Sequence, residues 1–352
     1  PTKGYGGGRC CDVETLLRTC RTENQQTFST AHPMKYRTLG RTGLRCSEIG
    51  LGTWAFASRA YGDVEEKDAV KTIRVALDAG INFFDTAPLY GTSERDGVSE
   101  EILGRGLGAD RAKVMVSTKF GRNSTQDAAP NFHAKRARES VEQSLRRLDT
   151  DHIDVLFFHS PFHPNDIHDD VWEALNDLKT QGKVQFIGHS ISMFQATQQM
   201  AREWATSGKI DVIQVVYSLL NREATKLIED LGGNGIGVVA RESLANGFLS
   251  GTVTKETVFP PSNLNSRYSR EEITERVDQV QRLSFLVRKD VKSVPQAAMR
   301  WVLDNPNVAL VLTGAKNSTE LRDCVAAVDS QSYTAEELAR ADVIHRKDYQ
   351  AA

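Results

Sequence analysis

The stretch Ile81–Gly91, INFFDTAPLYG, decides the fold, because an apolar run in it gives way at once to a carboxylate and then to a proline and a glycine. The residues INFF suit a buried β-strand, and APLYG is typical of the turn that ends one. The carboxylate of Asp85 therefore stands where a strand leaves the core, and the phenol of Tyr90 follows in the turn. Ionisable groups placed in this way predict a functional site at the end of the strand.

Short apolar runs of the same kind recur along the chain and predict eight strands. They are Glu48–Gly52, Ile81–Asp85, Lys113–Thr118, Ile153–Phe158, Val184–Gly188, Asp211–Val216, Gly237–Ala240 and Val308–Leu312. Amphipathic segments of helical length lie between them, such as Lys67–Ala79 and Ala134–Leu148. Strands that alternate with helices form parallel sheets, and strands that are apolar throughout are buried on both faces.

Eight such units predict an α/β protein with a closed (β/α)8 TIM barrel rather than an open sheet. An open sheet that binds a dinucleotide carries GxGxxG after its first strand, whereas the sequence after Gly52 is TWAFAS. Ahead of the barrel, Tyr36–Cys46 is interpreted as a β-hairpin that caps its bottom. Between the seventh and eighth strands, the loop Val258–Ser269 and the charged helix Arg270–Lys289 are inserted, so we expect extra helices in the C-terminal part.

Composition limits the class of protein and its compartment. Residues 1–33 are rich in Gly, Thr, Gln and Arg, so we expect a loosely ordered tail there and a single barrel domain over 34–352. With 39% hydrophobic and 26% charged residues and a net charge of -2, the chain resembles an ordinary soluble protein. It lacks the basic excess of nucleic-acid-binding proteins and any apolar run that could span a membrane. Five cysteines without framework spacing predict a reducing compartment, the cytoplasm; the sequence does not indicate an oligomeric state.

The predicted strand ends carry a set of ionisable groups that suit acid–base chemistry. Asp85, Lys119 and His159 end three consecutive strands, and Tyr90 follows the first of these; in such a barrel the chemistry lies at the C-terminal strand ends. A lysine ammonium favours a nearby phenolate and lowers the phenol's pKa, and a buried lysine needs a carboxylate partner. We therefore expect Asp85 to hold Lys119 and Lys119 to tune Tyr90, with His159 as a second donor. Such a set protonates an oxygen that gains negative charge, as a carbonyl oxygen does when hydride reaches its carbon.

Several motifs in order resemble the aldo-keto reductase superfamily from about Met34 to about residue 330. They are TLGRTGLRCSEIGLGTW, INFFDTAPLYG, VSTKFG, LRRLDTDHIDVLFFHSP and GKVQFIGHS. The resemblance implies a (β/α)8 barrel that binds NADPH, or less often NADH, in an extended pose. It also implies hydride transfer between nicotinamide and a small-molecule carbonyl or alcohol substrate. The catalytic tetrad that it assigns is Asp85, Tyr90 as general acid and base, Lys119 and His159.

The same resemblance implies a set of cofactor contacts. Ser190 and Gln214 match the positions that hold the nicotinamide carboxamide, and Tyr217 matches the aromatic residue that stacks on the nicotinamide ring. The residues that match the pyrophosphate loop are Arg241, Ser243, Leu244 and Gly247. Those that match the turn for the adenosine 2′-phosphate and adenine are Gly314, Lys316, Ser318, Glu320 and Arg322.

Two departures from the family pattern affect these contacts. Ser190 is followed by Ile191 where the family usually has asparagine, which removes one amide contact to the carboxamide. Near the adenine, Glu320 and Cys324 replace the usual glutamine and asparagine. The carboxylate of Glu320 either repels a 2′-phosphate or caps the helix that begins there.

The substrate side is less sharply defined, and two other functions fit parts of the sequence. Trp54, Phe56 and His163 are expected to line the substrate pocket, whose polar loops indicate a hydroxylated or acidic carbonyl compound. One alternative is a metal-dependent barrel hydrolase built on His159, His163, His168 and His189; it gives Tyr90 and Lys119 no role, and we expect no metal site. The other is a non-catalytic, cofactor-binding regulatory module on the same barrel.

Overall fold

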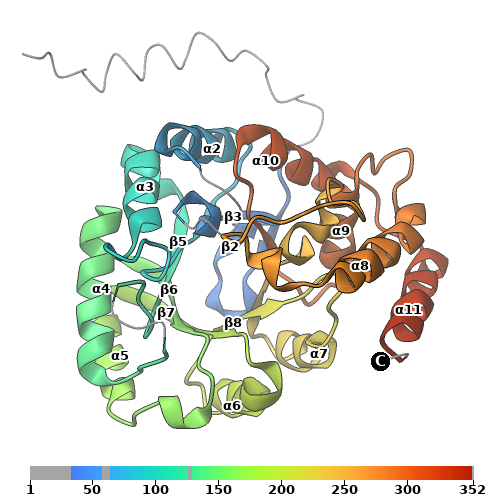
Figure 1. Ribbon diagram of the computed structural model, residues 1–352. Helices are drawn as coiled ribbons and strands as arrows, with labels where there is room; N and C mark the ends of the chain where they lie inside the picture. Colours follow the sequence, from blue (N-terminus) through green and yellow to red (C-terminus); the bar gives the residue numbers. More distant parts are fainter. Residues whose placement is uncertain (1–32, 58–63, 126–128, 351–352) are drawn as a thin grey trace, which may run out of the picture. The chain divides into compact units, whose positions relative to one another are not determined.

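Eight parallel strands close into a barrel in the computed structural model, which describes residues 33–57, 64–125 and 129–350 (Figure 1). The strands are β3 (Ile49–Gly52), β4 (Phe83–Asp85), β5 (Met115–Phe120), β6 (Ile153–His159), β7 (Val184–Ile191), β8 (Val212–Val216), β9 (Gly237–Arg241) and β10 (Leu310–Thr313). Each pairs in parallel with the strand before it, and β10 closes the barrel against β3. The predicted TIM barrel is confirmed.

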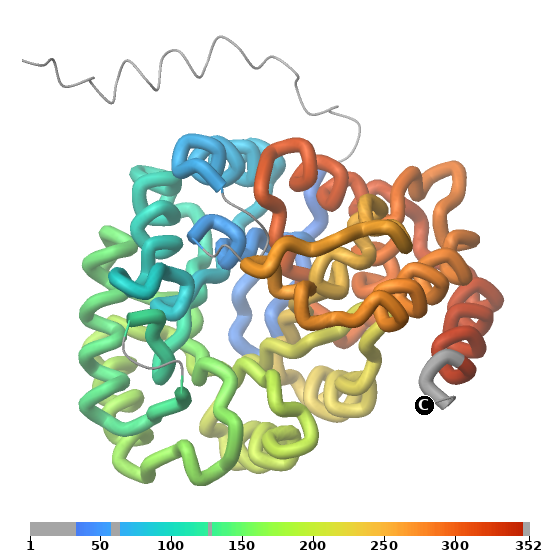
Figure 2. Tube along the Cα trace, viewed as in Figure 1, coloured from blue at the N-terminus to red at the C-terminus, as the bar shows by residue number. Residues whose placement is uncertain are grey.

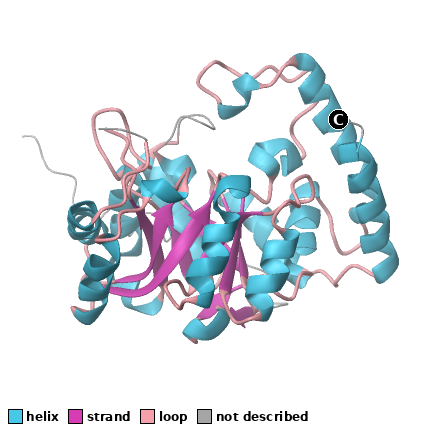
Figure 3. Ribbon diagram, turned by 90° about the horizontal axis from the view of Figure 1, so that it is seen from below, coloured by secondary structure: helices cyan, strands magenta, loops and turns pink. Residues whose placement is uncertain are grey.

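A ring of helices covers the barrel (Figure 3). The helices that follow successive strands are α2 (Glu66–Asp78), α3 (Val98–Leu107), α4 (Ala134–Leu148), α5 (Val171–Thr180), α6 (Phe194–Thr206), α7 (Thr225–Gly233), α9 (Val294–Leu303) and α10 (Ser318–Val325). In α4, Val141, Leu145 and Leu148 are buried on one side. Such a stripe packs on the sheet and leaves the arginines of the helix on the solvent side.

The strands differ from the predicted ranges mainly at their ends. The strand expected at Lys113–Thr118 is shifted to Met115–Phe120, because Gly108–Lys113 forms a 3-10 helix, η3. The strand β7 continues past Gly188 to Ile191, and β6 ends on His159. The shift matters for the site because it places Lys119 inside a hydrogen-bonded strand, where its backbone is fixed on both sides.

The barrel interior is filled by large apolar side chains. Phe157 is fully buried and lies against Gly188 of the neighbouring strand, where an added Cβ would come within 2.4 Å of the Phe157 ring. Only glycine therefore lets β7 run beside that ring. The surrounding buried core includes Phe83, Val155, Val212, Val239, Leu310 and Leu312. A packed interior of this kind separates the two ends of the barrel.

The bottom of the barrel is closed by the expected hairpin. The strand β1 (Tyr36–Thr38) pairs antiparallel with β2 (Arg45–Ser47), and Leu39 between them is fully buried. The prediction of an N-terminal hairpin cap is confirmed. The barrel lies in the compact unit Met34–Ala352, and the tail predicted for residues 1–33 lies almost wholly outside the described residues.

The insertion between β9 and β10 forms the orange part of the chain in Figure 2. It contains η5 (Ala245–Ser250), η6 (Leu264–Arg267), α8 (Arg270–Arg282) and η7 (Ser284–Leu286). The Nδ2 atom of Asn265 donates to the carbonyl oxygen of Asn246 at 2.8 Å, so the inserted loop folds back onto the end of β9. The charged helix ends at Arg282, earlier than predicted, because the chain tightens into η7. A final helix, α11 (Ala335–Gln350), completes the C-terminal part.

Within the described ranges, no helix combines the length and the apolarity that a membrane crossing requires.

Candidate active site

The four residues of the predicted tetrad meet at the C-terminal ends of β4, β5 and β6. The Nζ atom of Lys119 lies 2.6 Å from Oδ2 of Asp85 and 3.0 Å from the hydroxyl oxygen of Tyr90. The ring of His159 meets the ring of Tyr90 edge to face, with centroids 5.8 Å apart. Because the three strands are neighbours in the sheet, Asp85, Lys119 and His159 at their C-terminal ends come together, and Tyr90 joins them from the loop after β4.

Tyr90 is returned over the strand ends by a tight turn after Asp85. The amide of Tyr90 donates to the carbonyl of Ala87 at 3.0 Å, and the amide of Ser99 donates to the carbonyl of Tyr90 at 3.0 Å. Lys119 also donates to the carbonyl of Thr86 at 2.8 Å. The lysine therefore fixes both the backbone of the turn and the phenol that the turn carries.

Three donors hold the carboxylate of Asp85 in place. Besides Lys119, the hydroxyl of Ser117 donates to it at 2.7 Å and Nε2 of Gln214 donates to it at 2.9 Å. Asp85 and Lys119 are only 3% and 1% exposed. Burial acts to lower the pKa of Lys119, but Asp85 and Tyr90 outweigh burial and raise that pKa above its ordinary value. The ammonium therefore stays charged at neutral pH.

The pKa of Tyr90 moves in the direction opposite to the one expected from its lysine neighbour. Burial raises the pKa of Tyr90 above 10, and the Asp85 carboxylate adds to the rise, while Lys119 opposes both. The lysine acts as predicted, but burial of the phenol is the larger effect. Tyr90 is thus a protonated phenol at neutral pH.

His159 is held as a neutral imidazole. Burial, followed by the positive charges of Lys119, Arg122 and Arg241, lowers the pKa of His159 well below its usual value. The ring is 6% exposed, and its Nδ1 atom has no hydrogen-bond partner in the described part of the protein. A buried imidazole nitrogen without a partner, beside the phenol of Tyr90, suits contact with a bound molecule.

Ser190 and Gln214 lie next to the tetrad but are engaged with the protein. The hydroxyl of Ser190 lies 3.4 Å from Oε1 of Gln214, whose Nε2 donates to Asp85. Both residues are buried, at 1% and 0% exposure. This geometry gives Gln214 a role in orienting Asp85, beside the carboxamide contact that was expected of it.

Tyr217 requires a correction, because the structure does not bring it to the site. Its ring packs on Trp301 of α9, with centroids 4.9 Å apart, and its hydroxyl accepts a hydrogen bond from Nδ2 of Asn305 at 3.4 Å. Side chains alternate along a strand, so Tyr217, three residues beyond the inward-facing Gln214, points outward into the helical layer. We therefore do not propose Tyr217 as a contact of the nicotinamide ring.

The residues matched to the pyrophosphate lie at the end of β9 and in the segment after it, and those matched to the adenosine lie after β10 and in the first turns of α10. The guanidinium of Arg241 reaches across the barrel mouth to the carbonyl of Ile191 at 3.0 Å and the hydroxyl of Ser192 at 2.6 Å. Leu244 precedes η5, and the Ser243 hydroxyl donates to the carbonyl of Tyr217 at 2.9 Å. Ser318 begins α10, and Lys316 and Arg322 flank its first turn. An added Cβ would contact nothing at Gly247 or Gly314, so both loops present open backbone.

Glu320, which was expected either to repel a 2′-phosphate or to cap the helix, takes part in the hydrogen bonds at the start of α10. The side chain of Asn317 accepts from the amides of Thr319 and Glu320, and Oε2 of Glu320 accepts from the amide of Lys316 at 2.9 Å. Asn317 is thus the N-cap of α10, and Glu320 binds the backbone amide directly ahead of it. The same carboxylate lies 3.9 Å from Nζ of Lys316, so it also neutralises part of the charge offered to a phosphate.

The residues present fit an extended dinucleotide at the barrel mouth. Among the described residues, the partnerless nitrogens of His159 and Arg241 lie at the C-terminal ends of β6 and β9, and the open backbone at Gly247 and Gly314 follows β9 and β10. Cations at Arg241, Lys316 and Arg322 suit its phosphates.

The three residues expected in the substrate pocket have different positions. Trp54 faces Tyr90, with ring centroids 6.3 Å apart, and is partly exposed. Phe56 is 3% exposed and belongs to the core. His163 is exposed and begins η4 (Pro164–Asp166), where no contact recorded among the described residues links it to the tetrad. Only Trp54 of the three is placed beside the reacting groups.

Sequence reasoning missed Arg122, which lies against Phe162 in the loop after His159. The guanidinium carbon of Arg122 lies 5.0 Å from the centroid of the Phe162 ring, and Arg122 acts electrostatically on both Tyr90 and His159. The sequence did contain a signal for this arginine, because Arg122 stands three residues after Lys119 at the end of a predicted strand.

The four histidines of the metal-hydrolase alternative do not converge. His189 packs against Trp204, with ring centroids 5.1 Å apart, and His168 packs against His133 at 5.9 Å. His163 is exposed, and His159 belongs to the tetrad. Over residues 33–57, 64–125 and 129–350, no group of three potential ligands is arranged to hold a metal ion.

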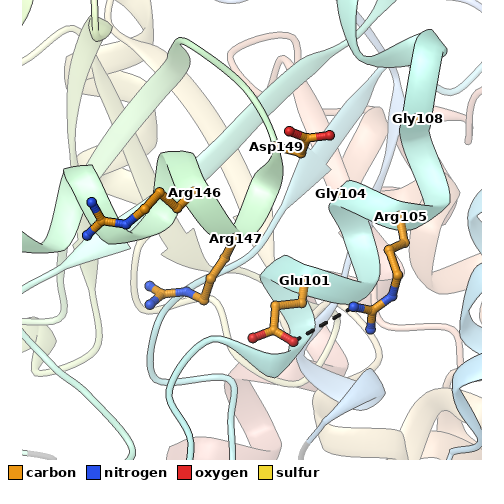
Figure 4. Close-up of a pocket in the computed structure, with 7 residues that line it drawn as sticks. All are labelled: Glu101, Gly104, Arg105, Gly108, Arg146, Arg147 and Asp149. Atoms are coloured by element: carbon orange, nitrogen blue, oxygen red, sulfur yellow. Dashed lines mark ion pairs between the residues drawn. The ribbon is translucent and has the colours of Figure 1, made fainter.

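A cleft of about 410 Å³ lies elsewhere, between α3 and α4 (Figure 4). Its lining includes Arg105 and Arg147, which form ion pairs with Glu101 at 3.8 Å and with Glu100 at 2.7 Å. The cleft lies at the C-terminal ends of these helices, which point toward the barrel end opposite to the tetrad because the helices run antiparallel to the strands. It is not part of the candidate site.

Comparisons with known proteins agree with this geometry. The sequence profile of the Aldo/keto reductase family matches residues 48–346. The aldo-keto reductase YhdN of Bacillus subtilis is 34% identical over 297 residues, which cover 82% of this chain and 87% of that protein. The NADH-specific methylglyoxal reductase of Escherichia coli is 31% identical over 316 residues, covering 84% and 94%.

A solved structure is similar over nearly the whole barrel. The glycerol dehydrogenase AKR11B4 of Gluconobacter oxydans superimposes with a TM-score of 0.74 at 30% sequence identity, covering 90% of this chain and 95% of that one. Family profile, relatives and fold agree, and the chain belongs to the aldo/keto reductase family of NAD(P)H-using oxidoreductases.

Proposed function

We propose that this protein is an NAD(P)H-dependent carbonyl reductase or alcohol dehydrogenase in which Tyr90 is the general acid and base. The observation that carries the proposal is the bridge made by one buried ammonium: Lys119 contacts the carboxylate of Asp85 at 2.6 Å and the phenol of Tyr90 at 3.0 Å. A structural ion pair does not need the phenol, whereas a proton donor needs a cation beside it when it becomes an anion.

The tetrad divides the work of handling the proton. Tyr90 gives its proton to the carbonyl oxygen, and the ammonium of Lys119 stabilises the phenolate that remains. Asp85 keeps Lys119 charged, while Ser117 and Gln214 keep Asp85 in place. The neutral imidazole of His159 donates a hydrogen bond to the same carbonyl oxygen and orients it.

The cofactor is proposed to lie along the loops that follow β7, β9 and β10. Ser190 and Gln214 would flank the nicotinamide, Arg241, Ser243, Leu244 and Gly247 the pyrophosphate, and Gly314, Lys316, Ser318, Glu320 and Arg322 the adenosine. Bound nicotinamide would supply the hydride that the carbonyl carbon receives. The contribution of the chain is to position that group and to exclude water beneath Trp54.

NADPH is the proposed cofactor, with NADH accepted less well. Lys316 and Arg322 carry positive charges near the start of α10, where Glu320 carries a negative one 3.9 Å from Nζ of Lys316. We expect Glu320→Gln to raise the affinity for NADPH several-fold and to leave that for NADH unchanged, because glutamine keeps the helix cap and removes the charge. Quenching of protein fluorescence gives both dissociation constants, and Glu203→Gln on α6 is the control for net charge. Equal changes for the two cofactors would argue against this assignment.

The substrates are proposed to be small, oxygenated carbonyl compounds. Two relatives are named for methylglyoxal reduction and glycerol oxidation, and small carbonyl substrates are typical of the family. The polar loop that begins at Ser160 supports a hydroxylated or charged substrate rather than a steroid. A reducing compartment, the cytoplasm, is proposed because Cys46 and Cys324 are buried free thiols.

Replacement of Tyr90 by phenylalanine tests the function. General acid–base catalysis contributes about 10²–10⁴-fold, so we expect Tyr90→Phe to lower kcat by about that factor and to leave NADPH affinity nearly unchanged. The decay of NADPH absorbance with a panel of aldehydes, ketones and sugars measures kcat. Full activity in the variant would refute the role of Tyr90. A wild-type protein that binds NADPH and reduces nothing in the panel would favour the regulatory-module alternative.

A further inference from the structure

Two serine hydroxyls outside the tetrad connect the end of β9 to the residue that follows His159. The guanidinium of Arg241, the last residue of β9, donates to the Ser192 hydroxyl at 2.6 Å. Ser192 in turn donates to the Ser160 hydroxyl at 2.8 Å. Because Ser192 follows β7 and Ser160 follows β6, these hydrogen bonds cross the barrel mouth from β9 past β8 to β6.

The arginine fixes the direction of these hydrogen bonds. A guanidinium can only donate, so Ser192 accepts from Arg241 and has its own hydrogen free for Ser160. Arg241 is itself held by two further contacts, a hydrogen bond to the carbonyl of Ile191 at 3.0 Å and an ion pair with Glu242. Arg241 is therefore a fixed anchor for the two hydroxyls.

The backbone of Ser160 forms a turn that has His159 at its centre. The amide of Ser160 donates to the carbonyl of Phe158 at 3.0 Å, which closes a three-residue turn. The φ of Ser160 is 53°, a left-handed conformation that a serine rarely adopts. Ser160 is buried, and its hydroxyl is the group that Ser192 reaches. The hydroxyl thus ties down an uncommon turn that sets the direction in which His159 leaves β6.

The imidazole of His159 depends on this turn for its direction. Its Nδ1 atom has no hydrogen-bond partner among the described residues, and the ring meets the ring of Tyr90 edge to face, with centroids 5.8 Å apart. Such a packing contact allows the ring to shift when its backbone shifts. A displacement of about 1 Å is enough to weaken a hydrogen bond that a reaction needs and to lower its rate.

We infer that Ser192 and Ser160 are positioning residues, which hold the His159 imidazole where it meets the carbonyl oxygen of the substrate. This inference rests on the proposed function, in which His159 donates a hydrogen bond to that oxygen. Ser192 lies outside the tetrad and outside the set of expected cofactor contacts. Its hydroxyl should therefore affect the rate of reduction and leave cofactor binding unchanged.

Removal of the middle hydroxyl tests this role. Ser192 is exposed, so we expect Ser192→Ala to fold and to unfold in denaturant as the wild type does. The single-turnover rate of aldehyde reduction should fall about tenfold, and the dissociation constant for NADPH should stay within about twofold. Ser192→Thr keeps a hydroxyl and should restore most of the lost rate. The control is Ser207→Ala, which removes an exposed hydroxyl that donates to the carbonyl of Glu203 within α6, and it should keep the wild-type rate.

A double-mutant cycle shows whether Ser192 acts through His159. If it does, Ser192→Ala should have little further effect on the rate once His159→Gln has been made. Equal losses in the two backgrounds would overturn the inference, and so would an unchanged rate in Ser192→Ala or a rate that Ser192→Thr does not restore. Weaker NADPH binding with an unchanged rate at saturating NADPH would assign the hydroxyl to the cofactor site and overturn it as well.

A spectroscopic measurement decides the question even without turnover. Because the rings of His159 and Tyr90 are in contact, the proton resonances of His159 depend on the position of its ring. In protein labelled at histidine, the signals that disappear in His159→Gln identify that residue. We expect these signals to shift or broaden in Ser192→Ala and to stay in place in Ser207→Ala. If no aldehyde is reduced, the proposed function fails, but this spectrum still tests the positioning. Unchanged His159 signals in Ser192→Ala would overturn the inference.

Discussion

Lys119 is the residue on which the proposed chemistry depends, since it contacts both the carboxylate of Asp85 and the phenol of Tyr90, the proposed proton donor. Its partner carboxylate, Asp85, is fixed by three donors, so the ammonium has little freedom to move. Burial raises the pKa of Tyr90 and lowers that of His159, each away from neutrality. The site thus holds a protonated phenol beside a neutral imidazole over a wide range of pH.

This pattern predicts how reduction depends on pH. Reduction needs the protonated phenol, and the pKa of Tyr90 lies above its ordinary value of 10, so the phenol stays protonated as pH rises through neutrality. His159 stays neutral because its pKa lies below 6.5. Single-turnover reduction should therefore be constant between about pH 7 and pH 9 and fall only above about pH 10. An inflection near neutral pH that disappears in Tyr90→Phe would contradict this picture.

His189 predicts a second pH effect, which concerns stability. The ring is fully buried against Trp204, both of its nitrogens lack partners among the described residues, and burial lowers the pKa of His189 to about 3. The unfolded chain binds the proton near pH 6.5, so this contribution to stability is complete above that pH and is lost as pH falls toward 3. The free energy of unfolding should drop by about 2 kcal/mol between pH 7 and pH 5 on this account.

The variant His189→Phe isolates that effect, because it keeps an aromatic ring and removes the titrating group. Denaturant unfolding at pH 7 and pH 5 should show a weaker pH dependence in His189→Phe than in the wild type. His152→Gln, at a partly exposed histidine beside Asp151, should keep the wild-type dependence. The same pH dependence in His189→Phe and wild type would show that other groups cause it.

The tetrad could be predicted from sequence, but several of its neighbours could not. Asp85, Lys119 and His159 end strands that are adjacent in the barrel, so strand order alone brings them together. The outward direction of Tyr217 could have been predicted from side-chain alternation, since Tyr217 lies an odd number of residues from the inward-facing Gln214. The net rise in the pKa of Tyr90 could not be predicted from the sequence, because it depends on how deeply the phenol is buried, and no motif encodes that burial.

At the scale of elements, the loop that carries Tyr90 is tied to the next loop of the barrel. The Asp96 carboxylate accepts from the Asn123 side chain at 2.7 Å and from the amides of Ser124 and Thr125 at 2.8 and 2.9 Å. Burial acts to raise the pKa of Asp96, but these hydrogen bonds outweigh burial and lower it. Asp96 thus joins the loop after β4 to the loop after β5, which bears Arg122.

We expect Asp96→Ala to reduce kcat/KM by about tenfold and the free energy of unfolding by about 1 kcal/mol, because the partly buried amides of Ser124 and Thr125 lose their acceptor. Steady-state kinetics and denaturant unfolding measure the two effects. Asp110→Ala removes a carboxylate with two cationic partners near the start of β5, at the opposite barrel end, and should leave kcat/KM unchanged. Unaltered kinetics in Asp96→Ala would show that Tyr90 is positioned without this tie.

Element bounds were predicted best where the pattern is periodic and worst where short turns intervene. The helix α4 has the predicted range because its apolar stripe and its end at Leu148 coincide. The strand β5 was misplaced because Gly108–Lys113 forms a 3-10 turn that hydrophobicity does not signal. The division into a tail of residues 1–33 and a single domain over 34–352 stays a prediction.

At the scale of the whole molecule, the candidate active site lies at one end of the barrel, and the segments that close the barrel bottom lie at the other end. The tetrad occupies the C-terminal strand ends, while the hairpin and the turn before β10 close the bottom. Arg37 of β1 joins these distant parts of the chain. Its guanidinium donates to the carbonyls of Leu303, Asn305 and Val308 at 2.7, 3.3 and 2.9 Å, and to Glu48 at 2.7 Å.

The hydrogen bonds of the Arg37 guanidinium should therefore contribute to stability without affecting catalysis. We expect Arg37→Met to lower the free energy of unfolding by about 2–4 kcal/mol, because it leaves several carbonyls and the Glu48 carboxylate, 5% exposed, without their donor. At 25 °C, well below the melting temperature, kcat and KM should stay within about twofold of wild type, since the packed core separates the two ends. Arg45→Met, at an exposed position of the same hairpin, controls for the loss of a charge. If the unpaired carboxylate is a main cause, Glu48→Gln should restore part of the stability in the Arg37→Met background, whereas additive losses in the double variant would assign the effect to the carbonyls alone.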